Sequence, residues 1–199
     1  MSHKLIHQIW VGPHPIPEKS INFIVKIKEL HPHYKYKLWT DKDLDSDNFS
    51  NLSYINKTPI YAQKADIMRY EILYKYGGIY LDIDFEIFKC LDPLLTNDLV
   101  VCNEDSYIDK YMSIGFIYSI PGTTYLKNCV DNIKKCPLGG VVNVAIATGP
   151  WYFRKQISLE DARVLQTHVM YPTHFTAKGL RPNKFSPETY GMHHWDKNW

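Results

Sequence analysis

Asp82 and Asp84 are two aspartates separated by one isoleucine in this 199-residue chain. Their spacing suits the binding of a metal ion by both carboxylates. In an extended segment residues i and i+2 point to the same side, and their Cα atoms lie about 6.5–7 Å apart. Both carboxylates could then bind one hydrated divalent cation, directly or through its waters. Without a cation the two like charges repel each other. The spacing therefore predicts a metal site at this pair.

A helix and a buried strand are predicted to position the two carboxylates. Over residues 59–76 apolar and aromatic side chains recur three and four positions apart, which is the helical period. Gly77 and Gly78 supply the positive-φ positions that end a helix, and the apolar residues 79–81 favour a short strand. An isolated Asp-x-Asp is usually a solvated turn. Here the pair would emerge at the C-terminal end of a core strand, where open α/β sheets bind ligands.

Residues 65–84, ADIMRYEILYKYGGIYLDID, resemble the signature of the glycosyltransferases that share an Asp-x-Asp sugar-binding segment. The likeness is densest over residues 62–86 and is greatest to the family 32 group, with a more distant likeness to the large clostridial glucosylating toxins. It implies a metal-dependent glycosyltransferase of GT-A type. Such an enzyme moves a sugar from a nucleoside-diphosphate sugar to a hydroxyl acceptor, with retention of the anomeric configuration.

The resemblance assigns catalytic and donor-binding roles around the strand. It implies that Asp66 bonds to hydroxyls of the donor sugar and that Arg69 contacts the sugar or the phosphate. It also implies that Asp82 contacts the ribose or sugar, while Asp84, helped by Asp82, holds the cation. Asp66 and Arg69 are three residues apart and so share one helix face, where the alternative is a surface ion pair. A cation beside them would neutralise the departing diphosphate as a Lewis acid.

A second segment that resembles the family lies near the start of the chain, HQIWVG at residues 7–12. It implies that Trp10 stacks on the base of the donor nucleotide, an interaction worth about 1–3 kcal/mol. A tryptophan in the core or at its rim is the alternative.

A third segment, HHWDKNW at residues 193–199, resembles the closing segment of the family. It implies that Asn198 or Trp199 meets a phosphate oxygen and that a histidine supplies a nitrogen ligand, which suits Mn²⁺. Two adjacent histidines cannot both readily reach one ion. We choose His194 over His193 because His194 lies five residues before Trp199. The alternative is that these side chains only attach the tail to the core.

The expected ligands are Mn²⁺ or Mg²⁺ and a nucleotide-sugar donor, with UDP-sugars and GDP-mannose both open. Glu104 and Asp105, which follow a predicted strand, are candidates for contacting a carbohydrate acceptor, and a solvated loop is the alternative. The family commonly has an asparagine near the donor on the strand predicted at residues 113–120. Gly115 stands there instead, which leaves the detailed donor contacts open.

Strand, helix and strand patterns follow one another from the start of the chain, which predicts parallel strands joined by crossovers. Strands are predicted at residues 4–11, 34–39, 98–103, 113–120 and 164–171, helices at 18–30 and 123–135, and a surface loop at 45–58. The fold class expected is α/β: a single GT-A, Rossmann-like domain with a mainly parallel mixed sheet flanked by helices. A nucleotide-binding half would span about residues 1–105, and an acceptor half with the closing segment about 106–199.

Composition excludes several other classes of protein. The 23 basic and 21 acidic side chains are spread along the chain, so we expect no nucleic-acid partner. No window approaches the roughly 18 apolar residues of a membrane span, and the N-terminus lacks a signal-peptide pattern. We therefore expect a cytoplasmic location, or a soluble piece of a longer protein, whereas the Golgi relatives carry an anchor. The four cysteines show no C-x-x-C spacing and are expected to be mostly reduced thiols, with one disulfide left open.

Two other interpretations are weighed. Haloacid-dehalogenase-type phosphatases also begin with Asp-x-Asp after a strand, but they require a small residue such as threonine where this chain has Glu86. The second interpretation is a non-catalytic module that binds a nucleotide sugar or a glycan. Such a module would bind the donor without transferring its sugar. The sequence does not predict an oligomeric state.

Overall fold

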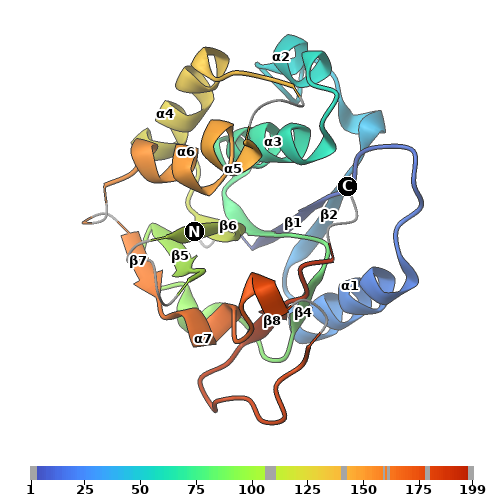
Figure 1. The fold of residues 1–199 in the computed structure, drawn as a ribbon, viewed down its shortest axis with the longest axis vertical. Helices are drawn as coiled ribbons and strands as arrows, with labels where there is room; N and C mark the ends of the chain where they lie inside the picture. The colour runs from blue at the N-terminus through green and yellow to red at the C-terminus, as the bar shows by residue number, and fades with distance from the viewer. Residues whose placement is uncertain are drawn as a thin grey trace.

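A six-stranded sheet forms the centre of the protein (Figure 1). The structure is a computed structural model and describes residues 4–105, 111–139, 143–158, 160, 162–177 and 180–196. In spatial order the strands are β2 (Lys35–Trp39), β1 (Leu5–Ile9), β3 (Gly78–Leu81), β6 (Met112–Ser119), β5 (Leu99–Asn103) and β7 (Ala162–Leu165). Strand β6 runs antiparallel to β3 and β5, and the other pairings are parallel. The mainly parallel mixed sheet predicted from the sequence is confirmed.

Helices cover both faces of the sheet (Figure 1). Their bounds are α1 (Glu18–Leu30), α2 (Leu52–Lys57), α3 (Tyr61–Tyr76), α4 (Thr124–Asn132), α5 (Val144–Ala147), α6 (Pro150–Gln156) and α7 (Thr167–Met170). Single 3₁₀ turns lie at Asp41–Asp43, Asp92–Leu94, Ile133–Lys135 and Phe175–Ala177. Helices α3, α4 and α6 pack on one face, and α1 and α7 lie on the other.

Strand β3 divides its side chains between the two halves of the core. Tyr80 packs into the cluster beneath α3 and α4, while Ile79 and Leu81 pack into the cluster that holds residues of α1 and α7. All three are buried, because successive side chains of a strand alternate and both faces of this sheet are covered. This explains why β3 reads as a continuous apolar run.

A separate two-stranded sheet brings the end of the described chain back to the acidic segment. Strand β4 (Phe85–Ile87) pairs antiparallel with β8 (Gly191–His193), and Phe85 stands opposite His193. Both strands lie below the central sheet in Figure 1. The pairing fixes the position of the closing segment next to Asp82 and Asp84.

The predicted loop at residues 45–58 was wrong in part, because α2 lies within it. A carboxylate from another helix caps the start of α2: Glu71 of α3 accepts hydrogen bonds from the backbone N–H groups of Ser50, at 2.6 Å, and Asn51, at 2.9 Å. Ile55 is fully buried on the inner side of α2. This acceptor comes from about 20 residues away, and Asn51 at the N-cap position makes no side-chain cap hydrogen bond of its own.

The predicted late strand at residues 164–171 was also wrong in part. Strand β7 ends at Leu165, and α7 carries Val169 and Met170 under the sheet into the cluster around Phe85 and Tyr171. Burial of these apolar side chains overrides the strand propensity of the segment.

Two expectations about the whole chain can be checked on the described residues. All four cysteines are free thiols, as the sequence predicted for most of them. Within the described ranges, no helix is long and apolar enough to cross a membrane.

Gly78 provides a test of how closely β1 and β3 approach. Its φ is +96°, and a Cβ there would lie 2.5 Å from the carbonyl oxygen of Leu5, a backbone atom that cannot move alone. Gly122 has φ +74° with open space around it. We expect Gly122→Ala to lower the free energy of unfolding by about 1–2 kcal/mol, from backbone strain alone. Gly78→Ala should lower it by clearly more, because the added Cβ also meets the Leu5 carbonyl. Thermal unfolding, at roughly 2–4 °C per kcal/mol, measures both. Equal melting temperatures would contradict the close approach.

Candidate active site

The acidic pair lies in a tight turn and not in an extended segment. The N–H of Phe85 donates to the carbonyl of Asp82 at 3.2 Å, which closes a four-residue turn directly after β3. The N–H of Asp82 donates to the carbonyl of Gly115 at 2.8 Å, and the Gln8 side chain donates to the carbonyl of Asp82 at 3.1 Å. The predicted extended geometry was wrong, because the chain has to reverse to pair β4 with β8. The turn still brings both carboxylates to one point.

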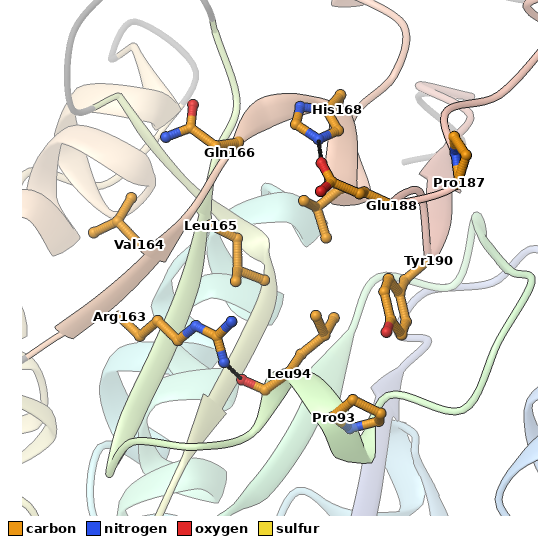
Figure 2. A pocket seen from close by; sticks show the side chains of 11 residues that line it. Pro93, Leu94, Arg163, Val164, Leu165, Gln166, His168, Pro187, Glu188 and Tyr190 are labelled. Atoms are coloured by element: carbon orange, nitrogen blue, oxygen red, sulfur yellow. Dashed lines mark hydrogen bonds and ion pairs between the residues drawn. The ribbon is translucent and has the colours of Figure 1, made fainter.

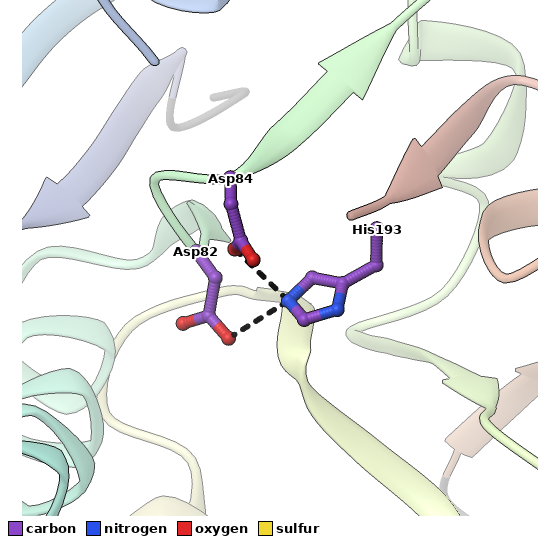
Figure 3. A group of neighbouring side chains, drawn as sticks. All are labelled: Asp82, Asp84 and His193. Carbon is purple, nitrogen blue, oxygen red and sulfur yellow. Dashed lines mark ion pairs between the residues drawn. The ribbon is translucent and has the colours of Figure 1, made fainter. Parts of the chain in front are cut away.

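That point is completed by His193 from β8, as Figure 3 shows. Its Nε2 lies 3.0 Å from Asp84 Oδ1 and 3.5 Å from Asp82 Oδ2. One ligand atom from each of the three side chains lies within 4.8 Å of the others. Two carboxylate oxygens and one imidazole nitrogen form a donor set that suits Mn²⁺. These residues therefore fit the divalent cation that the sequence predicts.

The geometry places His193, and not the predicted ligand His194, beside the two aspartates. His194 Nε2 contacts Glu86 Oε2 at 3.0 Å, and its ring stacks on Phe23 of α1 with centroids 4.9 Å apart. Neighbouring residues of an extended chain point to opposite sides, so only one of the two histidines can face the aspartates. The register of β8 on β4 decides that it is His193.

The imidazole of His193 partly compensates the charge of the two carboxylates. Burial works to lower the pKa of His193, but the charges of Asp84 and Asp82 and their hydrogen bonds raise it to about 10. Burial works to raise the pKa of Asp84, but the charge of His193 and their hydrogen bond lower it to about 2. At neutral pH the metal-free site therefore holds two carboxylates around one imidazolium.

Asp66 and Arg69 form a buried ion pair and not the surface pair of the alternative interpretation. Arg69 Nη2 lies 3.0 Å from Asp66 Oδ1, and its Nη1 lies 3.2 Å from Asp82 Oδ1. Nη1 also donates to the carbonyl of Ile114 at 2.7 Å. The Thr148 hydroxyl donates to Asp66 Oδ2 at 2.8 Å. Helix α3 is thereby joined to the acidic turn and to β6.

Burial determines the charges of this pair as well. Desolvation raises the pKa of Asp66 to about 6, although the Arg69 charge and the Thr148 hydrogen bond work to lower it. For Arg69, burial works to lower the pKa, but Asp82 and other negative neighbours raise it above its usual value. The guanidinium thus stays charged in a buried position.

Hydrogen bonds and an ion pair hold the segment after β8 over the cluster of Asp82, Asp84 and His193. The N–H of Asp196 donates to Asp84 Oδ2 at 3.0 Å, and Lys19 Nζ of α1 lies 3.1 Å from Asp196 Oδ2. Trp195 has φ 58°, which is uncommon for a non-glycine residue, and its ring packs edge-on to His193 with centroids 4.3 Å apart. Asn198 and Trp199, the predicted phosphate contacts, lie outside the described residues.

Trp10 is placed beside the acidic turn, but its ring is mostly covered. It packs against Ile83 and Ile24, its Nε1 donates to the carbonyl of His14 at 2.7 Å, and 7% of the residue is exposed. Little of the ring is open to a base in this arrangement. Base stacking by Trp10 stays a prediction.

A pocket of about 250 Å³ contains three of the predicted site residues, Asp66, Arg69 and Asp82. Its lining includes Asp66, Arg69, Asp82 and His193, together with Glu104, Tyr111, Ser113, Gly115 and Trp195. Glu104 was expected to be either an acceptor contact or a solvated loop residue, and the structure buries it in this pocket. Burial raises its pKa to about 7, against the lowering effects of the His193 charge and the Ser113 hydroxyl. Tyr111 and Trp195 were missed, because no local pattern places single aromatic residues at a distant site.

A second pocket, of about 420 Å³, lies between β7, α7 and the segment before β8 (Figure 2). His168 Nε2 and Glu188 Oε2 are 2.9 Å apart at its rim, and Arg163 donates to the carbonyl of Leu94 at 2.9 Å. It shares no lining residue with the acidic pocket and contains none of the predicted site residues. The acidic pocket is therefore the candidate active site.

A family model, described as the glycosyltransferase sugar-binding region containing the DXD motif, matches residues 17–101. The resemblance to this family that the sequence predicted is confirmed over these residues. The match runs from the proline before α1 into β5 and includes the ion pair of α3 and the acidic turn.

Curated relatives carry related names. Inositol phosphoceramide mannosyltransferase 3 of Schizosaccharomyces pombe is 44% identical over 96 residues, which cover 46% of this chain and 27% of the relative. Inositol phosphoceramide mannosyltransferase 2 of the same yeast is 32% identical over 154 residues, or 74% of this chain and 44% of the relative. The chain thus spans from about a quarter to less than half of the length of these relatives.

Solved structures show the same fold. The PaToxG glycosyltransferase matches with a TM-score of 0.57 and 22% identity, over 79% of this chain and 68% of that chain. The galactosyltransferase LgtC, solved with donor and acceptor sugar analogues, matches with a TM-score of 0.53 and 11% identity, over 96% and 86%. These likenesses confirm the predicted GT-A fold class.

A substitution at Gly115 tests whether the Asp82 carboxylate needs the space that the missing Cβ leaves. A Cβ at this position would lie 2.8 Å from Asp82 Oδ2 and 3.1 Å from the Tyr171 hydroxyl, both at the ends of side chains. We expect Gly115→Ala to displace the Asp82 carboxylate and to weaken Mn²⁺ binding by about tenfold, the scale of a disturbed ligand shell. The fold should be retained. Titration with Mn²⁺ and thermal unfolding measure the two effects, and an unchanged Mn²⁺ affinity would show that the space at residue 115 is not needed.

Proposed function

We propose that the protein is a metal-dependent, retaining glycosyltransferase that moves a sugar from a nucleoside-diphosphate sugar to a hydroxyl group of a carbohydrate or related acceptor. The observation that carries this proposal is the meeting of Asp82, Asp84 and His193 in a cation-binding arrangement. The buried Asp66–Arg69 pair lines the same pocket. The names of the yeast relatives favour a mannosyl donor, GDP-mannose, over a UDP-sugar.

Each part of the proposed site has a separate task. A divalent cation held by Asp82, Asp84 and His193 would supply the positive charge that stabilises a departing nucleoside diphosphate. Arg69 is fixed by Asp66 and Asp82, so its guanidinium is positioned before the substrate arrives.

Asp66 is proposed to accept hydrogen bonds from donor-sugar hydroxyls. One of its oxygens contacts Arg69 and the other accepts from Thr148, so the carboxylate is held in a defined orientation. The ring of Trp195 lines the pocket and packs on His193, which excludes water from one side of the cation site. We assign donor binding mainly to residues up to about 105, and acceptor binding with closure mainly to the residues that follow.

The first experiment is a thermal-shift panel with GDP-mannose, UDP-glucose and UDP-galactose, each with and without Mn²⁺. A donor present at about a hundredfold over its Kd should raise apparent stability by about 2.7 kcal/mol, only when Mn²⁺ is present. Asp84→Asn removes a charge and no volume, so the folded variant should lose most of this shift. An equal shift in Asp84→Asn would contradict the site, and a shift without any hydrolysis or transfer would favour the non-catalytic binding module.

The two adjacent histidines form a matched pair of variants. His193→Gln should weaken Mn²⁺ binding by at least about tenfold, because it removes a proposed ligand. His194→Gln should leave Mn²⁺ binding close to that of the wild type, since His194 contacts Glu86 and Phe23. Electron paramagnetic resonance of free Mn²⁺ measures both affinities. The reverse order of effects would restore the choice made from the sequence.

A further inference from the structure

Glu104 is a carboxyl of the pocket that the donor and metal site do not use. It follows β5 directly, is 9% exposed, and lines the pocket together with Asp82 and His193. The register of the β5–β6 pairing shifts between Val101 and Asn103. Irregularities of this kind change the direction of side chains next to active sites. In the part of the chain that the structure describes, no cationic side chain forms an ion pair with Glu104. Its carboxylate therefore has hydrogen-bond capacity left over inside the pocket.

Hydrogen bonds hold the residues around Glu104 in place. The Ser113 hydroxyl accepts hydrogen bonds from the Tyr171 hydroxyl at 2.5 Å and from the N–H of Gly115 at 3.0 Å. The Ser113 hydroxyl also acts on the Glu104 carboxyl, whose pKa it works to lower. The backbone is held as well, since the N–H of Glu104 donates to the carbonyl of Tyr111 at 2.8 Å. The backbone that carries the carboxyl is thus fixed before any substrate binds.

Aromatic rings line the same pocket. Tyr111 packs against the half-exposed Trp151 of α6 with centroids 5.0 Å apart, and Trp195 packs on His193 from the closing segment. Tyr111 and Trp195 both line the pocket that contains Glu104. A carboxylate beside aromatic faces suits a saturated ring with hydroxyl groups: the hydroxyls donate to the carboxylate, and the C–H face packs on the rings.

We propose that Glu104 binds the acceptor, and that its carboxylate accepts a hydrogen bond from a ring hydroxyl of a cyclic polyol, either a sugar or a cyclitol. This inference rests on the proposed function and names the acceptor part of the same site. Asp66, Arg69, Asp82, Asp84 and His193 are assigned to the donor and the cation, so Glu104 is the carboxyl of the pocket lining that remains for the second substrate.

The test compares Glu104→Gln with Glu188→Gln, which makes the same chemical change in the separate pocket of Figure 2. Three quantities are measured with Mn²⁺: donor affinity, donor hydrolysis by water, and transfer to methyl α-D-mannopyranoside or myo-inositol. For Glu104→Gln we expect donor affinity and hydrolysis within about threefold of the wild type. The ratio of transfer to hydrolysis should fall at least tenfold, through a raised KM for the polyol, as expected when a hydrogen bond to a charged acceptor is lost. Glu188→Gln should leave all three quantities unchanged.

A second variant covers the case in which Glu104→Gln does not fold. Glu104→Asp keeps the charge and withdraws the carboxylate by one methylene group, and it should lower the same ratio by a smaller factor. An unchanged ratio in the folded variants, or a tenfold loss of donor affinity, would overturn the assignment of Glu104 to the acceptor. A wild-type protein that hydrolyses the donor but glycosylates neither polyol would overturn it too. Absence of donor binding and hydrolysis in the wild type would instead overturn the proposed function itself.

Discussion

The buried guanidinium of Arg69 is the constraint on which the site depends. It joins Asp66 on its own helix, Asp82 in the acidic turn and a carbonyl of β6. A buried charge is tolerated only when its partners are in place, and removal of one partner leaves the others buried and unpaired. Helix α3, the end of β3 and β6 therefore have to keep their relative positions. The ion pair that orients the site also links three elements of the fold.

The second determinant is the pairing of β4 with β8. It brings residues more than 100 positions apart into contact and places the His193 imidazole against two carboxylates that would otherwise repel each other. In the absence of a metal the protonated imidazole supplies the positive charge. The same three side chains provide the oxygen and nitrogen atoms that a divalent cation would use. Charge compensation and the proposed metal binding thus share one set of atoms.

The pocket has two chemically different sides. One is formed by the ion pair of α3, the acidic turn and the closing segment, and its charges suit a nucleoside diphosphate and its cation. The other contains Glu104 and Tyr111 at the ends of β5 and β6, and it suits a neutral ring with hydroxyl groups. The proposed transferase has to hold two substrates in contact, and this division would give each of them its own type of interaction. The fold itself is shared with solved glycosyltransferases at low sequence identity, so the particular chemistry depends on these side chains.

Much of the fold was predictable because its signals are local. The periodicity of residues 18–30, the glycine pair at 77–78 and the apolar run before Asp82 predicted α1, the end of α3 and β3. Local periodicity and turn chemistry act over a few residues, and the burial of both faces of β3 agrees with them. The acidic pair was identified for the same reason, since its two members are neighbours in sequence.

Other features were decided only by tertiary structure. The cap of α2 comes from Glu71, and the acidic segment turns because β4 has to meet β8. Glu104 is buried in a pocket whose lining comes from several distant segments. The choice between His193 and His194 depends on a one-residue strand register, which reverses the direction of every side chain. By itself the sequence determined most of the strands and helices of the central sheet and the acidic pair, because those follow from local propensity and spacing. Tertiary structure decided which distant side chains complete the site, because that depends on the pairing and packing of segments far apart in the chain.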